Sequence, residues 1–385
     1  MNIGFREEIT VKKRLKTSVI LIAGLALALA GCGKNDQPTG TASGSAEPSG
    51  SASAAGAAKL KVVTTFYPMY EFSKQVGGEY ADVVALVPPG TEPHDWEPSP
   101  QDMVKVKEAD IFVYNGLVEE WVEDALASAA NDKRIIVKAS EGIELMEGLP
   151  HEHEHGHEDE HADEHADEHA DEHADEDEHA DEHADEHADE DEHADEHADE
   201  HGDEHADEHE HVLDPHVWLD PVLAQQQVAA IAAAFAKADP DRKDDYKKNA
   251  DAYIAKLQEL DEAFKTELGG AKRKEFVTQH AAFGYLAKRY GLTQLPISGL
   301  SPDQEPSPNE MAEIVEFAKE HQVKTIFFET LVDPKVAQTV ADELGARTDV
   351  LNPLEGLTEE EVGNNQDYIA IMRSNLEALK KALNE

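Results

Sequence analysis

The stretch PDRKDDYKKNADAYIAKLQELDEAFKTELGG, residues 240–270, sets how the folded part of the chain is organised. Its apolar side chains recur at spacings of three and four, and they are Tyr246, Ala250, Tyr253, Ile254, Leu257, Leu260 and Phe264. At 1.5 Å per residue, this stripe predicts an amphipathic helix roughly 40 Å long. Gly269-Gly270 ends it.

Short apolar runs alternate with amphipathic stretches on both sides of this helix. Strands are predicted at residues 60–64, 83–87, 111–114 and 134–138 before it, and at 275–278, 294–297, 325–328 and 347–351 after it. Helices are predicted from Pro221 and at residues 281–290, 308–321, 334–344 and 365–383. This alternation predicts two α/β halves with mostly parallel sheets and a cleft between them. Ligands of open α/β sheets bind at the carboxyl ends of the strands, so the cleft is the expected site.

One block carries most of the unusual composition of this 385-residue chain. Residues 151–211 hold 17 of the 21 histidines and 32 of the 83 acidic residues, without any Lys or Arg. From His161 onward the unit His-Ala-Asp-Glu occurs ten times. Carboxylates spaced four apart without basic partners repel one another, so we expect a disordered loop. A net charge of −50 also excludes nucleic acid as a partner, because no basic face is available to bind phosphate.

The composition of this block suggests weak metal binding. Imidazoles are mostly neutral at pH 7, and the surrounding carboxylates concentrate cations near them. We interpret the block as a low-affinity collector of several zinc ions; a slippage repeat tolerated in a surface loop is the alternative. The candidate weak ligands at its two ends are His151, His153, His155, His157, His161, His209 and His211.

The N-terminus is typical of an exported lipoprotein. Lys12, Lys13, Arg14 and Lys16 precede an apolar run at residues 19–30 that is too short to span a membrane comfortably. The tetrad LAGC at 29–32 resembles the bacterial lipobox, so residues 1–31 are interpreted as a signal peptide. Cys32, the only cysteine, is then the site of lipid attachment. Residues 32–58, rich in Ser, Gly, Ala and Thr, form a flexible tether.

Four histidines lie outside the charged block, and three of them are placed where groups facing the cleft are expected. His94 lies among five prolines at residues 88–100, His216 lies between Pro215 and Pro221, and His280 follows a predicted strand. Taken singly, each is better explained as a hydrogen-bonded structural histidine. Three imidazoles together with one carboxylate, however, form a ligand set that suits zinc. The fourth, His321, ends a polar helix and is expected at the surface.

Four ordered motifs carry a resemblance to a known family. They are PPGTEPHDWEPSP at 88–100, DPHVWLDP at 214–221, HAAFGYLA at 280–287 and LNPLEGL at 351–357. From about residue 59 to 385, without the charged block, the sequence resembles the zinc-binding members of the metal-specific solute-binding proteins of bacterial ABC importers. The resemblance implies an α/β fold of two Rossmann-like lobes joined by one long rigid helix, with the metal site in the cleft between the lobes.

The resemblance also implies the metal ligands. His94 and His216 would bind from the first lobe and His280 from the second, and the fourth motif position falls on Glu355. Manganese-binding relatives have a carboxylate at the position of His280, so a third imidazole here favours zinc. Glu329, Asp333, water or a carboxylate of the charged block remain alternatives for the fourth ligand.

The same resemblance divides the chain into parts. The N-terminal lobe would comprise residues 59–150 and 212–238, with the metal-binding loop 151–211 inserted into it. A connecting helix at 239–270 and a C-terminal lobe at 271–385 would follow.

The implied function is an extracytoplasmic, high-affinity zinc receptor that delivers Zn²⁺ to an ABC permease. Its partners would be the permease and ATPase subunits and, through Cys32, the lipid membrane; a monomer is expected. The lipobox and long tether favour a Gram-positive surface over a periplasm. No catalytic residues are expected, because a zinc hydrolase needs an open zinc position and a general base, and no His-Glu-x-x-His or Gly-x-Ser-x-Gly motif occurs. A surface adhesin or metal buffer that works without a transporter stays open as an alternative.

Overall fold

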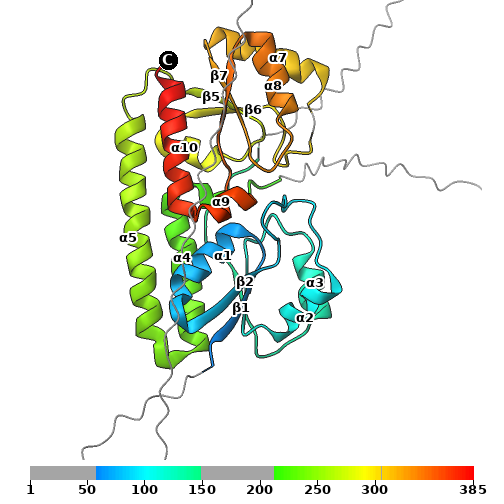
Figure 1. Cartoon of the computed structure of the whole chain (residues 1–385), viewed down its shortest axis with the longest axis vertical. Coiled ribbons are helices and arrows are strands. Elements are labelled where there is room, and N and C mark those ends of the chain that lie inside the picture. Colours follow the sequence, from blue (N-terminus) through cyan, green and yellow to red (C-terminus); the bar gives the residue numbers. More distant parts are fainter. Residues whose placement is uncertain (1–57, 149–211, 305) are drawn as a thin grey trace, which may run out of the picture. The chain divides into compact units, whose positions relative to one another are not determined.

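The computed structural model describes residues 58–148, 212–304 and 306–385 (Figure 1), all of them within one compact unit, Ala57–Glu385. The expected signal peptide at 1–31, nearly all of the tether and the whole charged block therefore lie outside the described residues. Within the described part, no helix combines the length and apolar character needed to cross a membrane.

Four parallel strands form the sheet of the first lobe, in the order β2-β1-β3-β4. They are β1 (Leu60–Thr64), β2 (Ala81–Ala85), β3 (Ile111–Tyr114) and β4 (Ile135–Lys138), connected by α1 (Tyr67–Gly77), the 3₁₀ turn η1 (Gly78–Tyr80), α2 (Pro100–Glu108) and α3 (Val122–Ser128). The strand order reverses between β1 and β3. Such a switch point opens a crevice at the carboxyl ends of the strands.

The second lobe repeats this topology, with parallel strands in the order β6-β5-β7-β8. Its elements are β5 (Glu275–Thr278), α6 (Gly284–Tyr290), β6 (Thr293–Pro296), α7 (Pro308–Glu320), β7 (Thr325–Phe328), α8 (Lys335–Leu344), β8 (Arg347–Val350), α9 (Glu359–Gly363) and α10 (Tyr368–Leu383). The expected α/β fold of two similar lobes is confirmed.

A helical hairpin joins the two lobes. A short turn, η2 (Val217–Leu219), leads into α4 (Pro221–Ala238), and η3 (Pro240–Arg242) turns the chain into α5 (Lys243–Leu268). Asp220 caps α4 by accepting the N–H groups of Val222 and Leu223. Helix α5 contacts α1 and α4 of the first lobe and α6 and α10 of the second. Figure 1 shows α4 and α10 alongside it. The predicted long helix is therefore present, with α4 packed along it.

One hydrophobic core runs from the first sheet through this hairpin into α10 and the second sheet. Phe72 of α1 contacts both Tyr253 of α5 and Tyr368 of α10, with ring centroids 6.1 and 5.2 Å apart. Two smaller clusters cover the other faces of the sheets. Because a single core includes both lobes, the described part behaves as one packed body rather than as two independent domains.

Several predicted boundaries differ from those of the structure by two or three residues. The second strand, predicted at 83–87, lies at Ala81–Ala85. The helix predicted from residue 281 begins at Gly284, and the Ala281 N–H before it donates to Gly299 O at 2.8 Å. The helix predicted at 365–383 is α10, which begins at Tyr368 because the Asp367 side chain caps it by accepting the Ala370 N–H. The short helix α9 before it was not predicted.

Candidate metal centre

The first candidate ligand, His94, is held by the proline-rich loop that follows β2. Proline fixes the backbone φ angle, so a loop with five prolines has few conformations. The Gly90 N–H donates to Leu357 O at 2.7 Å, which ties this loop to the segment of the second lobe that carries Glu355. The Glu92 carboxylate accepts the His94 N–H at 3.0 and 3.1 Å. These contacts hold His94 against the second lobe.

His216 immediately precedes η2 and is completely buried. One oxygen of Asp214 accepts the His216 backbone N–H at 2.9 Å and lies 2.8 Å from its Nδ1. Asn115, at the end of β3, donates to Pro215 O at 3.0 Å and fixes the segment to the first sheet. The Nε2 atom of His216 is left facing the second lobe.

His280 follows β5 and is also completely buried. Glu329, directly after β7, accepts the His280 N–H at 3.1 Å, and the same oxygen lies 2.5 Å from Nδ1. The backbone carbonyl of His280 accepts from the Thr278 hydroxyl at 2.8 Å and from Gln294 Nε2 at 3.0 Å. Three neighbouring strands of the second sheet therefore position this imidazole.

Glu355 lies in the segment that follows β8 and is 2% exposed. The preceding residue, Leu354, has a φ of 60°, a left-handed conformation that a residue with a side chain adopts only at a cost. Asn352 stabilises this turn by accepting the Leu354 N–H at 2.7 Å. Trp218, two residues after His216, donates to Pro353 O at 2.8 Å. The strained turn and the Trp218 bond aim the Glu355 carboxylate at the histidines.

The structure brings the four predicted ligands together. One donor atom each from His94, His216, His280 and Glu355 lies within 4.8 Å of all the others. The Nε2 atoms of the three imidazoles lie 3.1, 3.1 and 3.3 Å from Glu355 Oε1, and those of His216 and His280 are 3.3 Å apart. Zinc bonds of 2.0–2.1 Å in a tetrahedron place neighbouring donors about 3.4 Å apart. The donor set therefore matches zinc in both chemistry and spacing.

The charges of the four side chains depend strongly on one another. Burial alone would lower the pKa of His280, but the negative charges of Glu329 and Glu355 outweigh it and raise that pKa well above its usual value. The pKa of His94 is raised in the same way, with Glu355 overcoming the effect of burial. Burial favours the neutral acid of Glu355, yet His280 and His94 hold its pKa well below the usual range. Within the cluster, the ionised form of Glu355 and the protonated forms of His94 and His280 therefore favour one another.

The two alternative carboxylates lie elsewhere. Glu329 contacts Nδ1 of His280 rather than the Nε2 atoms that face Glu355. Asp333 accepts the Lys335 N–H at 3.1 Å at the start of α8, as expected for a capping side chain. His321 follows α7 and stacks on Phe317 with ring centroids 4.2 Å apart. The contacts of Asp214 and Glu329 with histidine Nδ1 atoms are the part of the site that motif reasoning did not predict.

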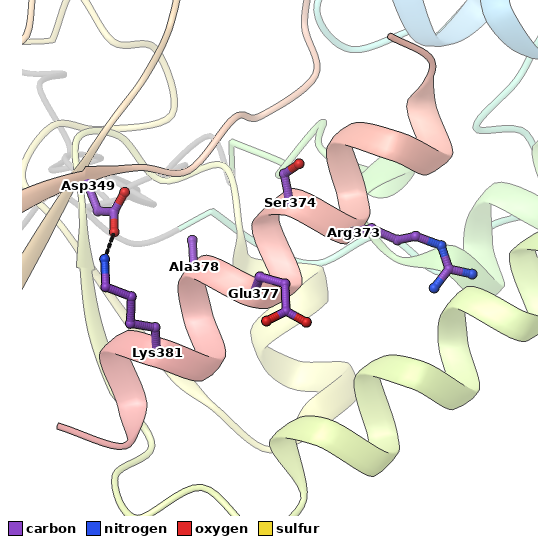
Figure 2. Close-up of a pocket in the computed structure, with 6 residues that line it drawn as sticks. All are labelled: Asp349, Arg373, Ser374, Glu377, Ala378 and Lys381. Atoms are coloured by element: carbon purple, nitrogen blue, oxygen red, sulfur yellow. Dashed lines mark hydrogen bonds and ion pairs between the residues drawn. The ribbon is translucent and has the colours of Figure 1, made fainter.

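Two hollows lie away from the Nε2 atoms. One, of about 240 Å³, lies behind the histidines and is lined by Met146, Asp214, Ala281, Gly284 and Leu300 among others. The other lies between β8 and α10, where Lys381 pairs with Asp349 at 2.7 Å across a shallow surface (Figure 2). Neither contains a cluster of metal-binding side chains comparable to that around Glu355 within the described ranges.

Other candidate residues lie outside the described part of the chain. They are Cys32 and the histidines at the two ends of the charged block, His151, His153, His155, His157, His161, His209 and His211. Their expected roles stay predictions.

Two parallel-sheet lobes with a buried His₃Glu cluster between them define the class of metal-ion solute-binding proteins. Solved structures agree with this class. A metal-dependent lipoprotein from Bacillus subtilis, YcdH, is 44% identical with a TM-score of 0.63, and the match covers 85% of this chain and 100% of that one. The Zn(II)-bound ZnuA-like domain of Streptococcus pneumoniae AdcA is 39% identical with a TM-score of 0.62 over the same shares of the two chains.

Residues 62–382 match the family model described as ZnuA, zinc-uptake complex component A periplasmic, and the chain belongs to this family. The high-affinity zinc uptake system protein ZnuA of Bacillus subtilis is 46% identical over 368 residues, which cover 95% of this chain and 97% of that protein. The zinc-binding lipoprotein AdcA of Streptococcus pneumoniae is 39% identical over 371 residues, and the chain spans 61% of its length. The family is one of transport proteins and not of enzymes.

Proposed function

We propose that this protein is the zinc receptor of an ABC uptake system, which captures Zn²⁺ outside the cytoplasm and delivers it to a permease. The observation that carries the proposal is the convergence of three imidazole Nε2 atoms on one Glu355 oxygen at 3.1–3.3 Å. Family membership and the similarity to a zinc uptake protein of Bacillus subtilis support zinc as the ion.

The closed donor set favours transport over catalysis. Four protein ligands fill the coordination shell of tetrahedral zinc, whereas a hydrolytic zinc keeps a position open for water. His94, His216, His280 and Glu355 supply that complete set, with two ligands from each lobe. Zinc would accordingly be held and released, with no chemical step at the site.

The receptor would work as a monomer anchored at the membrane surface. Lipid attachment at Cys32 would keep it near the permease, and residues 32–58 would give it reach. The lipobox and tether favour a Gram-positive surface. The cytoplasmic ATPase of the importer would power uptake, while this chain hydrolyses nothing.

A zinc titration in competition with a chelator tests the binding step. One tight equivalent per chain, lost in His216→Ala, is expected; absence of a tight equivalent in the unaltered protein would contradict the proposal. Delivery is tested by growth in zinc-depleted medium of a strain that keeps its permease but lacks its own receptor. Restored growth with this chain, and no growth with His216→Ala, is the expected result.

A further inference from the structure

Two of the three histidines share a hydrogen-bonding arrangement. In each, a single oxygen of a buried carboxylate contacts both the backbone N–H and Nδ1 of the same histidine. Asp214 does this for His216 at 2.9 and 2.8 Å, and Glu329 does it for His280 at 3.1 and 2.5 Å. Within the described residues, no equivalent acceptor lies on Nδ1 of His94. Glu92 accepts the backbone N–H of His94 and lies 4.0 Å from its Nε2 rather than on Nδ1.

This arrangement fixes which ring nitrogen faces the ion. An ionised carboxylate can only accept, so Nδ1 must carry a proton, and Nε2 is the atom that loses its proton to bind metal. The two contacts from one oxygen also restrict rotation of the ring. The Nε2 atoms of His216 and His280 are thereby held 3.3 Å apart, close to the spacing of two ligands on one zinc ion.

Packing of the second lobe does not explain Glu329. The side chain is 3% exposed, and its second oxygen, Oε2, has no hydrogen-bond partner among the described residues. A buried carboxylate that leaves an oxygen unpaired costs stability. Both hydrogen bonds seen for Glu329 go to His280, so its place in the core is explained by that histidine.

The second lobe makes room for Asp214, which belongs to the first. A Cβ atom at Gly284 would lie 2.7 Å from Asp214 Oδ2, too close for any side chain unless the carboxylate moved. Glycine at this position of α6 therefore keeps Asp214 in contact with His216. This close approach places an element of the second lobe directly against the carboxylate that orients a ligand of the first.

We propose that Asp214 and Glu329 are positioning residues, one for each lobe, that hold Nε2 of His216 and His280 in the orientation that binds the ion. The proposal rests on the proposed function only in taking zinc as the ion. No carboxylate of the described residues contacts Nδ1 of His94, so the orientation of its ring is not fixed in this way.

The test uses the full chain and three variants, Glu329→Gln, Glu329→Leu and Asp214→Leu. The two leucine variants should weaken zinc binding, measured by chelator competition, by about 10–100-fold, the usual effect of losing a partner of a metal-bound histidine. Glu329→Gln should lose less, because an amide oxygen can still accept both N–H groups without the negative charge. Bound Co²⁺, whose visible absorption reports ligand number and geometry, should give an altered spectrum in the leucine variants.

Asp261→Asn is the matched control. Asp261 is a carboxylate on α5 that is 6% exposed and binds Tyr290 and Lys265 rather than an imidazole. Its variant should keep the zinc affinity and the Co²⁺ spectrum of the unaltered protein. Loss of affinity equal to that of the leucine variants would overturn the proposal, as would leucine variants that behave like the unaltered protein. If the unaltered protein itself binds no zinc tightly, it is the proposed function that fails.

Discussion

Glu355 is the residue on which the metal site depends most. Its Oε1 atom lies 3.1–3.3 Å from three imidazole nitrogens, at the centre of a group of side chains with little access to water. The pKa values of His94 and His280 are raised and that of Glu355 is lowered, so protons on these two imidazoles offset the charge of Glu355 where zinc is not bound. In the proposed zinc site, Glu355 would therefore attract the cation and would offset the charge of protonated imidazoles before the cation arrives.

Zinc binding should weaken as the pH falls. The pKa values of His94 and His280 are raised, chiefly because Glu355 and, for His280, Glu329 outweigh the effect of burial. These imidazoles stay protonated above the ordinary histidine pKa of about 6.5, so zinc must displace protons there. We expect affinity to fall by about tenfold per pH unit for each displaced proton. Calorimetry in buffers of different ionisation enthalpy counts those protons. A zinc affinity that did not change between about pH 6 and pH 8 would contradict the prediction.

The same shifts have the opposite effect on the metal-free protein. A histidine whose pKa is raised on folding stabilises the folded state below its unfolded pKa, and that stabilisation is lost as the pH rises through the folded pKa. The metal-free protein should thus lose stability over the range in which zinc binding strengthens. Thermal unfolding with and without zinc separates the two trends.

The effect of replacing His280 on metal binding should depend on Glu329. In His280→Asp a new carboxylate would lie near the Glu329 oxygen that now contacts Nδ1, and two buried like charges oppose each other. We expect this variant to bind both zinc and manganese weakly. The double variant His280→Asp/Glu329→Gln should bind Mn²⁺ at least about tenfold more tightly than His280→Asp, a gain of roughly 1.4 kcal/mol. Titration followed by electron paramagnetic resonance measures it, and equal Mn²⁺ binding by the two variants would refute the coupling.

At the scale of elements, apolar periodicity predicted every strand to within two residues but did not predict the turns that aim the ligands. The strands and α5 are apparent from sequence because burial imposes a repeat of two or of about three and a half residues. The positive φ of Leu354 is stabilised by the hydrogen bond that its N–H donates to the Asn352 side chain. The contact of Glu329 with His280 joins residues that are 49 positions apart in the sequence. Such contacts have no local signal. The contact of Asp214 with His216 does have one, since Asp-Pro-His places the carboxylate two residues before the ring.

The turn η2 should stabilise the packing of the two lobes against each other. Trp218 is fully buried, and its Nε1 donates to Pro353 O at 2.8 Å, while its own carbonyl accepts from Tyr368. Trp218→Phe would leave the Pro353 carbonyl without that donor, which costs about 1–3 kcal/mol of unfolding free energy in addition to the lost packing. Urea denaturation of the metal-free protein measures the loss.

Trp121→Phe provides the comparison for Trp218→Phe. Trp121 Nε1 is buried without a partner among the described residues, so its removal breaks no hydrogen bond and relieves an unsatisfied donor. The loss of stability should therefore be smaller than in Trp218→Phe. Equal losses would show that ring size, and not the bond to Pro353, determines the effect.

At the scale of the whole molecule, α5 sets how far the lobes can move. It contacts α1 and α4 in one direction and α6 and α10 in the other, and its aromatic side chains belong to the core that includes both sheets. A wide hinge motion would break that core, so capture and release of zinc should involve local movement near the ligands. Rotation of the His94 ring is such a movement, because no carboxylate of the described residues contacts its Nδ1, while the Gly90 bond to Leu357 keeps the loop itself in place.

The charged block enters and leaves the fold at one point beside His216. Gly148 donates to Val212 O at 2.7 Å, and Asp214 donates to Met146 O at 2.9 Å, on either side of an antiparallel bridge. Gly148 and Val212 therefore form a hydrogen-bonded pair of the kind that a two-residue turn can close. Residues 149–211 can then be exchanged for Asn-Gly, which favours such a turn, without opening the segment that positions Asp214 and His216.

We expect this exchange to separate the two kinds of zinc binding. Residues 151–211 hold 17 histidines, whereas the site around Glu355 draws all four of its ligands from outside them. The shortened protein should keep one zinc equivalent with an affinity within about threefold of the original, a change well below the roughly tenfold that follows from 1.4 kcal/mol. The weaker equivalents that we expect calorimetry of the full chain to show should disappear. Loss of the tight equivalent would mean that the block, and not Glu355, completes the coordination shell; survival of the weak ones would remove the reason for regarding the block as a zinc collector.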